Sequence, residues 1–160
     1  MTFVRYLKNP NTLARKIAAP GGKRISAAVA DAEAELAEMA PAGLEAIDVC
    51  LATIAGSVVR TSEIPPSAET LETVYQAASA IHGSAAVFGL SDLGEAAWSL
   101  CELIDTGGGA LRTGAAAIGS HLDSLRLLRL GDALSSEQRR ELLDGLQELR
   151  LHTKQEAAGL

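Results

Sequence analysis

The residues of this chain best suited to chemistry lie close together between positions 79 and 83. His82 is one of three histidines among 160 residues, and an imidazole can act as a nucleophile or carry a proton near neutral pH. Ser79 lies three residues earlier, which makes the two side chains neighbours on a helix surface. Gly83 follows, although a glycine inside a helix costs about 1 kcal/mol relative to alanine. The stretch predicts a surface where another molecule approaches the backbone.

The element that must position these residues is predicted to be an amphipathic helix that begins after Ser67, a good N-cap residue. Apolar residues recur three or four apart along it, at Leu71, Val74, Ala78, Ile81, Ala85 and Phe88. On a helical wheel this apolar seam faces one way, Ser79 and Gly83 face outward, and His82 lies at the boundary. We expect the outward positions to bind a partner, namely Glu72, Gln76, Ser79, His82, Gly83 and Ala86.

The other segments also carry helical periodicity. Apolar spacing predicts helices over about 26–60, with either two helices or one kinked helix around Pro41, and then over about 92–106, 111–130 and 136–151. No run of alternating Val, Ile and Thr appears that would indicate a strand. The sequence therefore predicts an all-α fold, an antiparallel four-helix bundle with an extra N-terminal helical segment.

Charge divides the chain into two parts. Residues 1–24 contain six basic residues and no acidic ones, whereas the whole chain has a net charge of −6. We therefore expect a basic N-terminal arm over 1–24 and a helical bundle over 25–160. The strongly acidic bundle argues against nucleic acid as a partner. On this reading no stretch approaches the roughly 20 apolar residues of a bilayer-spanning helix, so we expect no integral membrane segment and a cytoplasmic location.

Cysteine, metal and catalytic patterns are sparse. Cys50 and Cys101 lie in apolar helical contexts, which favours buried free thiols over a disulfide or a metal site. Gly107, Gly108 and Gly109 lack the following Lys-Ser/Thr of a phosphate-binding loop. His121 and His152 have no partners at metal-ligand spacing. We expect no metal, no cofactor and no independent catalytic turnover.

The stretch from Ser79 to Leu90 resembles the histidine-containing phosphotransfer (HPt) domains of bacterial phosphorelays. Those domains typically read Ala-His-x-Leu-Lys-Gly-Ser-Ala, with a second Gly six residues after the first. The residues that match this pattern are Ala78, Ile81, Gly83, Ser84, Ala85 and Gly89. The resemblance covers roughly 67–105 and implies an HPt-type bundle that binds a response-regulator receiver domain or a histidine kinase.

One departure from the pattern concerns the chemistry. Ser79 stands where the family carries its phosphorylated histidine, and a serine phosphate ester lacks the labile N–P bond needed for reversible exchange. His82 stands three residues later, at the lysine position, and is the candidate phosphoacceptor. Two interpretations of His82 stay open, a phosphoryl carrier and an ordinary surface histidine.

The sequence thus predicts a phosphorelay signalling protein that is degenerate in phosphotransfer or uses His82. The alternative is a helical adaptor without chemistry, or a homodimerisation module whose Gly83 face packs on itself.

Overall fold

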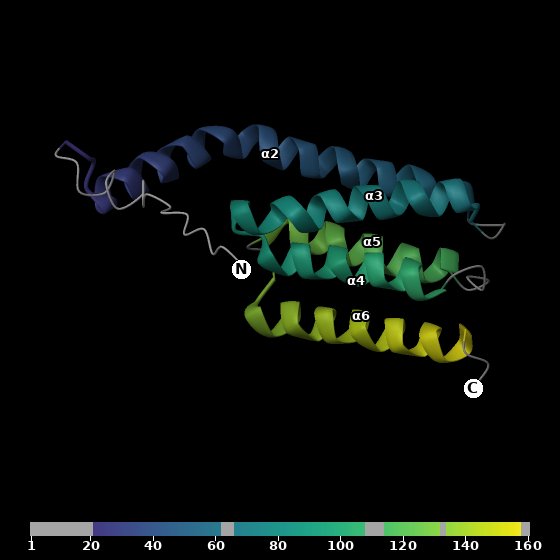
Figure 1. Cartoon of the computed structure of the whole chain (residues 1–160). Coiled ribbons are helices and arrows are strands. Elements are labelled where there is room, and N and C mark those ends of the chain that lie inside the picture. The colour runs from purple at the N-terminus through teal and green to yellow at the C-terminus, as the bar shows by residue number, and fades with distance from the viewer. Residues whose placement is uncertain (1–20, 62–65, 108–113, 132–133, 158–160) are drawn as a thin grey trace, which may run out of the picture. The chain divides into compact units, whose positions relative to one another are not determined.

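The structure is a computed structural model that describes residues 21–61, 66–107, 114–131 and 134–157 (Figure 1). Two compact units are distinguished along the chain, residues 1–39 and residues 40–160. Most of the predicted basic arm, residues 1–20, lies outside the described residues, and a domain boundary at 24/25 stays a prediction. All regular secondary structure in the described ranges is helical.

Helix α2 spans Ile25–Thr61 and contains Pro41. The structure therefore has one continuous helix where the sequence allowed two. Proline removes one backbone donor from a helix interior, and the apolar residues on both sides of Pro41 keep a helical spacing. In the second unit, the predicted stripe on this helix is buried at Ile47, Leu51 and Ile54.

Helices α3 (Ala68–Ala85) and α4 (Ser91–Gly107) form a helical hairpin. Ser67 is the N-cap of α3, because its Oγ accepts a hydrogen bond from the Thr70 N–H at 3.1 Å. The hairpin closes through the 3₁₀ turn η1 (Ala86–Phe88) and Gly89, whose φ of +76° is a left-handed conformation that suits glycine. The turn brings the start of α4 back alongside the end of α3.

Helices α5 (Gly114–Arg129) and α6 (Ser136–Ala157) complete the bundle. Ser135 caps α6 through a reciprocal pair of bonds: its Oγ accepts from the Gln138 N–H, and the Gln138 Oε1 accepts from the Ser135 N–H. Figure 1 shows α3 to α6 running alternately in opposite directions. Helix α4 contacts α3, α5 and α6, so it lies at the centre of this arrangement.

The core is built from Leu, Ile, Val and Ala, as the low aromatic content requires. The seam of α3 is buried at Val74, Ala78, Ile81 and Ala85, and each fully buried Val or Ile contributes about 1.5–3 kcal/mol. At the end of the seam the half-buried Phe88 lies so close to α2 that a Cβ at Gly43 would overlap its ring. The missing side chain of Gly43 therefore leaves the space in which the Phe88 ring packs against α2.

Ion pairs join helices that are distant in sequence. Arg129 at the end of α5 makes two bonds to the Asp48 carboxylate on α2, at 2.8 and 3.0 Å. Glu102 on α4 pairs with Arg150 on α6. The bidentate Arg129–Asp48 pair fixes two planar groups against each other and so favours one helix register.

The predicted fold class, an all-α antiparallel bundle, is confirmed. One expectation about composition needs correction. Among the described residues, α2 is long and apolar enough over Ile25–Val58 to meet the criteria for a membrane span. Only 17% of its apolar window is buried; in the second unit the helix packs into the core at Ile47, Leu51 and Ile54.

Candidate functional site

The outward face of α3, continued by Ala86 at the start of η1, carries all the residues predicted to bind a partner. Glu72, Gln76, Ser79, His82, Gly83 and Ala86 are exposed, while the opposite face is buried in the core. The Gln76 side chain donates a hydrogen bond to the Glu72 carboxylate at 2.7 Å, one turn away. The helix thus presents a polar first half and a second half of small side chains.

Gly83 leaves an opening in this face. A Cβ built at this position meets no heavy atom within 4 Å. Close packing inside the bundle therefore does not account for the glycine. The absence of a side chain instead allows another surface to reach the helix backbone beside Ser79 and His82.

His82 is held by the neighbouring helix. Its Nδ1 lies 3.0 Å from the carbonyl oxygen of Gly94 on α4. A carbonyl oxygen only accepts hydrogen bonds, so Nδ1 carries the proton. In the neutral imidazole the lone pair then lies on Nε2, which bonds to no group in the described part of the chain. The contact fixes both the tautomer and the orientation of the ring.

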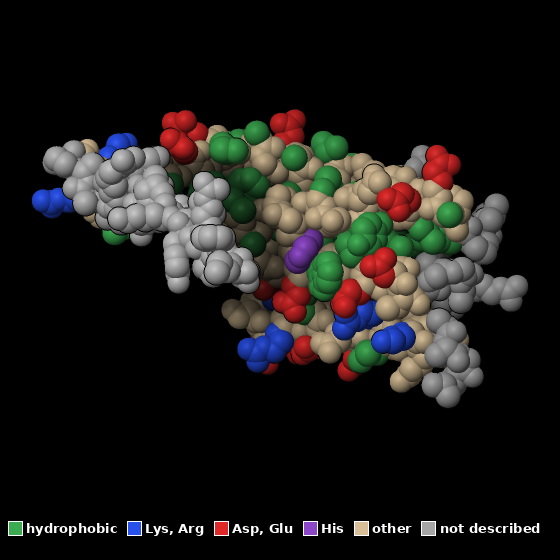
Figure 2. Space-filling model, viewed as in Figure 1, with side chains coloured by type: hydrophobic (Ala, Val, Ile, Leu, Met, Phe, Trp, Pro, Cys, Tyr) green, Lys and Arg blue, Asp and Glu red, His purple; other side chains and the backbone are tan. Residues whose placement is uncertain are grey.

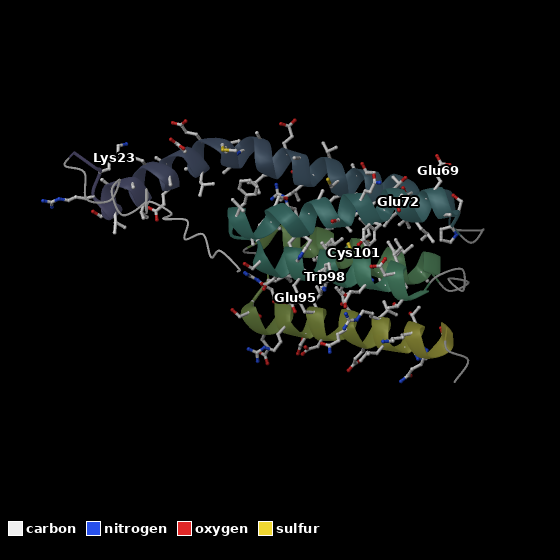
Figure 3. The ribbon with its side chains drawn as sticks, in the orientation of Figure 1. Lys23, Glu69, Glu72, Glu95, Trp98 and Cys101 are labelled. Carbon is white, nitrogen blue, oxygen red and sulfur yellow. The ribbon has the colours of Figure 1, made fainter. Side chains whose placement is uncertain are left out.

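Trp98 supplies a second contact to the same ring. The centroids of the His82 and Trp98 rings are 5.0 Å apart with an interplanar angle of 37°, within the range of favourable aromatic pairs. Figure 3 labels Trp98 and Glu95 on α4, and Figure 2 shows a histidine on this face beside hydrophobic and acidic side chains. Trp98 is itself 47% exposed, so the pair forms part of the protein surface.

Close approach of the two helices makes these contacts possible. A Cβ at Gly94 would lie 3.6 Å from the Ala85 Cβ and from the His82 carbonyl oxygen. These are ordinary van der Waals distances, so α3 and α4 lie close together here without requiring a glycine. Gly94 contributes through its carbonyl oxygen.

Ser79 is exposed on the same surface as His82. No hydrogen bond to its hydroxyl is present within the described ranges. Nothing around Ser79 activates it as a nucleophile, since no base lies within bonding distance in that part of the structure. Within the described residues, Ser79 is therefore a surface serine with no base beside its hydroxyl.

The other histidines occupy different environments. His121 on α5 is fully buried: its Nδ1–H donates to the Ala117 carbonyl oxygen at 2.9 Å, and its Nε2 lies 3.2 Å from the Ser99 hydroxyl. Burial lowers the pKa of His121, and the Ala117 bond only partly opposes this shift. His152 on α6 is exposed and lies 3.4 Å from Glu156.

The two cysteines are free thiols, as predicted. Burial, together with the nearby Asp105 carboxylate, raises the pKa of the Cys101 thiol to about 11. Cys50 is only partly buried, and its pKa is raised by the same desolvation. In the described ranges, no group of three or more His, Cys, Asp or Glu side chains is placed to hold a metal ion.

The sequence did not identify Gly94 and Trp98 as partners of His82. A signal existed, because a helical hairpin closing at 86–90 brings residues at similar distances from the turn side by side. His82 precedes the turn by about as many residues as Gly94 follows it, and Trp98 lies one turn beyond Gly94 on the same face. The Ser99–His121 bond between α4 and α5 had no such local signal.

Comparison with known families identifies the class of protein. The sequence profile of the Hpt domain family matches residues 25–152, which include every helix of the bundle up to most of α6. The chain therefore belongs to the Hpt domain family, and membership implies a role in phosphorelay signalling. No curated protein and no solved structure matches the chain in the corresponding comparisons.

Proposed function

We propose that this chain is a phosphorelay intermediate that docks a response-regulator receiver domain on the outward face of α3 and accepts the phosphoryl group on Nε2 of His82. A histidine kinase is the other partner class that the family implies. The observation that carries the proposal is the Nδ1–H bond from His82 to the Gly94 carbonyl oxygen at 3.0 Å, because it directs the free lone pair to Nε2.

The chemical step follows from this tautomer. The Nε2 lone pair attacks the phosphorus of an aspartyl phosphate on the receiver. The N–P bond forms as the P–O bond to the aspartate breaks, and the aspartate leaves as a carboxylate. The proton on Nδ1 remains shared with the Gly94 carbonyl oxygen during the attack. Since the chain only passes on the group, no turnover of its own is needed.

The surroundings of His82 support docking of a folded domain. Gly83 gives access to the α3 backbone, and Ala80, Ala86 and Val87 are exposed around it. Small apolar side chains at the centre of a surface, with polar groups at its rim, match the usual composition of a protein interface. A location in the cytoplasm, where such receivers would meet it, belongs to the same proposal.

A second function is favoured by one specific residue. Ser79 occupies the position of the family's phosphorylated histidine and has no activating partner among the described residues. A chain that keeps the docking face without the reactive group would bind a receiver and sequester it. In that case His82 serves only to pack against Trp98 and α4.

Incubation of the protein with a receiver domain carrying a labelled aspartyl phosphate tests both functions. Under the first, label moves to this chain, and His82→Ala abolishes the transfer while receiver binding is kept. His152→Ala is the matched control, because it removes an exposed histidine on another helix. That variant should accept label at the wild-type rate.

The stability of the label distinguishes the acceptor atoms. A phosphoramidate on imidazole is lost in acid and survives alkali, whereas an ester on Ser79 survives acid. Binding without label would support the sequestering function. If neither binding nor label is detected with receivers or kinases from the same cell, this chain has no such function in the relay.

A further inference from the structure

A cavity opens between α4 and α6 beside the exposed ring of Trp98. Helix α4 lines it with Glu95, Trp98 and Glu102, and α6 lines it with Leu143 and Arg150. Figure 3 shows Glu95 and Trp98 close together on α4, beside α6. The cavity volume of about 180 Å³ is smaller than the roughly 300–1,000 Å³ of typical small-molecule sites. The cavity therefore suits one side chain of a docked protein.

The charges at this cavity leave one carboxylate without a partner. Glu102 pairs with Arg150 across the cavity, so those two charges cancel. Among the described residues none bonds to the exposed Glu95 carboxylate. Glu95 also lines an adjoining hollow whose other charged residues balance one another, Arg139 and Arg140 against Asp92 and Asp144. The uncompensated negative charge is therefore that of Glu95, three positions before Trp98 and so its neighbour on the helix surface.

An exposed indole ring beside a free carboxylate is complementary to a guanidinium group. The face of tryptophan attracts cations more strongly than that of any other side chain. A planar guanidinium can stack on the ring while two of its N–H groups donate to the carboxylate, whereas a lysine ammonium lacks the planar face. The Trp98 ring also contacts His82, with 5.0 Å between the ring centroids. The cavity is therefore continuous with the outward face of α3.

We propose that the docked receiver domain inserts one arginine side chain into this cavity, with its guanidinium against the Trp98 ring and the Glu95 carboxylate. The contact rests on the receiver docking proposed for α3, and it specifies a basic residue that the receiver must carry near its aspartyl phosphate. Trp98 is then an aromatic anchor of the interface, of the kind that dominates binding energy. Glu95 selects for receivers with a basic residue at this place.

Titration with N-acetyl-arginine amide tests the cavity without a receiver. The chain has one tryptophan, so the indole N–H resonance in an NMR spectrum reports on Trp98 alone. This resonance should shift with the arginine amide and much less with the citrulline amide, which has a similar shape without the charge. Glu95→Gln should reduce the shift. The matched control is Glu141→Gln, which removes an exposed carboxylate of α6 outside the cavity and should keep the shift. Equal shifts with both ligands, no shift with either, or a full shift in Glu95→Gln overturns the proposal.

Titration with a receiver domain tests whether the receiver supplies the arginine. Glu95→Gln should weaken receiver affinity by about 3- to 10-fold, Trp98→Ala by at least about 10-fold, and Glu141→Gln should leave it unchanged. Far-UV circular dichroism verifies that each variant remains helical. Replacing the receiver's arginine with glutamine should weaken binding to the wild type but not further weaken binding to Glu95→Gln. A receiver that binds the wild type, Glu95→Gln and Trp98→Ala equally overturns the arginine contact and leaves the proposed function standing. A wild type that binds no receiver overturns both.

Discussion

Two histidines of this chain are held in the same way and lie in opposite environments. His82 on α3 and His121 on α5 each donate a hydrogen bond from Nδ1 to a backbone carbonyl oxygen, that of Gly94 at 3.0 Å and that of Ala117 at 2.9 Å. In both rings the lone pair therefore lies on Nε2. At His121 this nitrogen lies 3.2 Å from the Ser99 hydroxyl inside the core, whereas His82 is exposed.

The two histidines share a tautomer but differ in whether Nε2 is accessible to another molecule. An imidazole with its proton fixed on Nδ1 is prepared for attack through Nε2, yet at His121 the Ser99 hydroxyl and the core packing occupy that direction. The same local geometry therefore produces a structural hydrogen bond in one region and a candidate phosphoacceptor in the other. Exposure beside an open glycine is what makes His82 the candidate, rather than any property of the ring itself.

The largest expected effect concerns stability. His121→Ala should lower the free energy of unfolding by about 2–4 kcal/mol, because it leaves a cavity and removes the partner of Ser99. His82→Ala removes the hydrogen bond to the Gly94 carbonyl oxygen and the Trp98 contact at an exposed position, so it should lower the free energy of unfolding by only about 1 kcal/mol. Urea unfolding followed by circular dichroism measures both. Equal losses in the two variants would mean that both rings are structural.

The pH dependence of stability should give the next largest effect. The pKa of His121 is lowered in the folded state, so below its unfolded pKa of about 6.5 the unfolded chain takes up a proton that the folded chain does not. Stability is then lost as pH falls, by at most about 1.4 kcal/mol per pH unit for one group. Unfolding curves between pH 7.5 and pH 5.5, about the unfolded pKa, measure the slope.

His121→Gln cannot titrate and should flatten that slope. A slope that persists in His121→Gln would assign the dependence to other groups and would remove the contrast between the two histidines.

The smallest expected effect compares two glycines, one beside open space and one beside a packed side chain. Gly83→Ala should raise the free energy of unfolding by about 0.5–1 kcal/mol, because the new Cβ meets open space and alanine favours a helix. Gly43→Ala should lower stability, because the Phe88 ring occupies that space. Chemical unfolding and titration with a receiver domain test the pair. If docking needs a bare backbone, Gly83→Ala gains stability and loses receiver affinity.

Much of the fold followed from local patterns. The seam of α3 and its cap at Ser67 were predicted because each depends on a few neighbouring residues and their backbone preferences. The continuous path of α2 through Pro41 was left open, since local rules weigh proline against periodicity and cannot decide between them. The sequence led us to expect no stretch as long and apolar as a membrane span, whereas α2 meets those criteria over Ile25–Val58.

The candidate site was predictable only in part. Exposure of Ser79 and Gly83 followed from the helical wheel, which orders the side chains around one axis. The contacts of His82 did not, because Gly94 and Trp98 lie on another helix and no periodicity specifies how two helices pack. The buried His121 appeared as an ordinary histidine in the sequence, and only the approach of α4 to α5 gives it Ser99 as a partner.

The sequence by itself determined the helical class and the outward face of α3. These depend on side-chain type and on a repeat of 3.6 residues, both of which are local. The tertiary structure decided which nitrogen of His82 carries the proton and which histidine is accessible. Those properties depend on contacts between helices, and such contacts exist only once the apolar seams have packed.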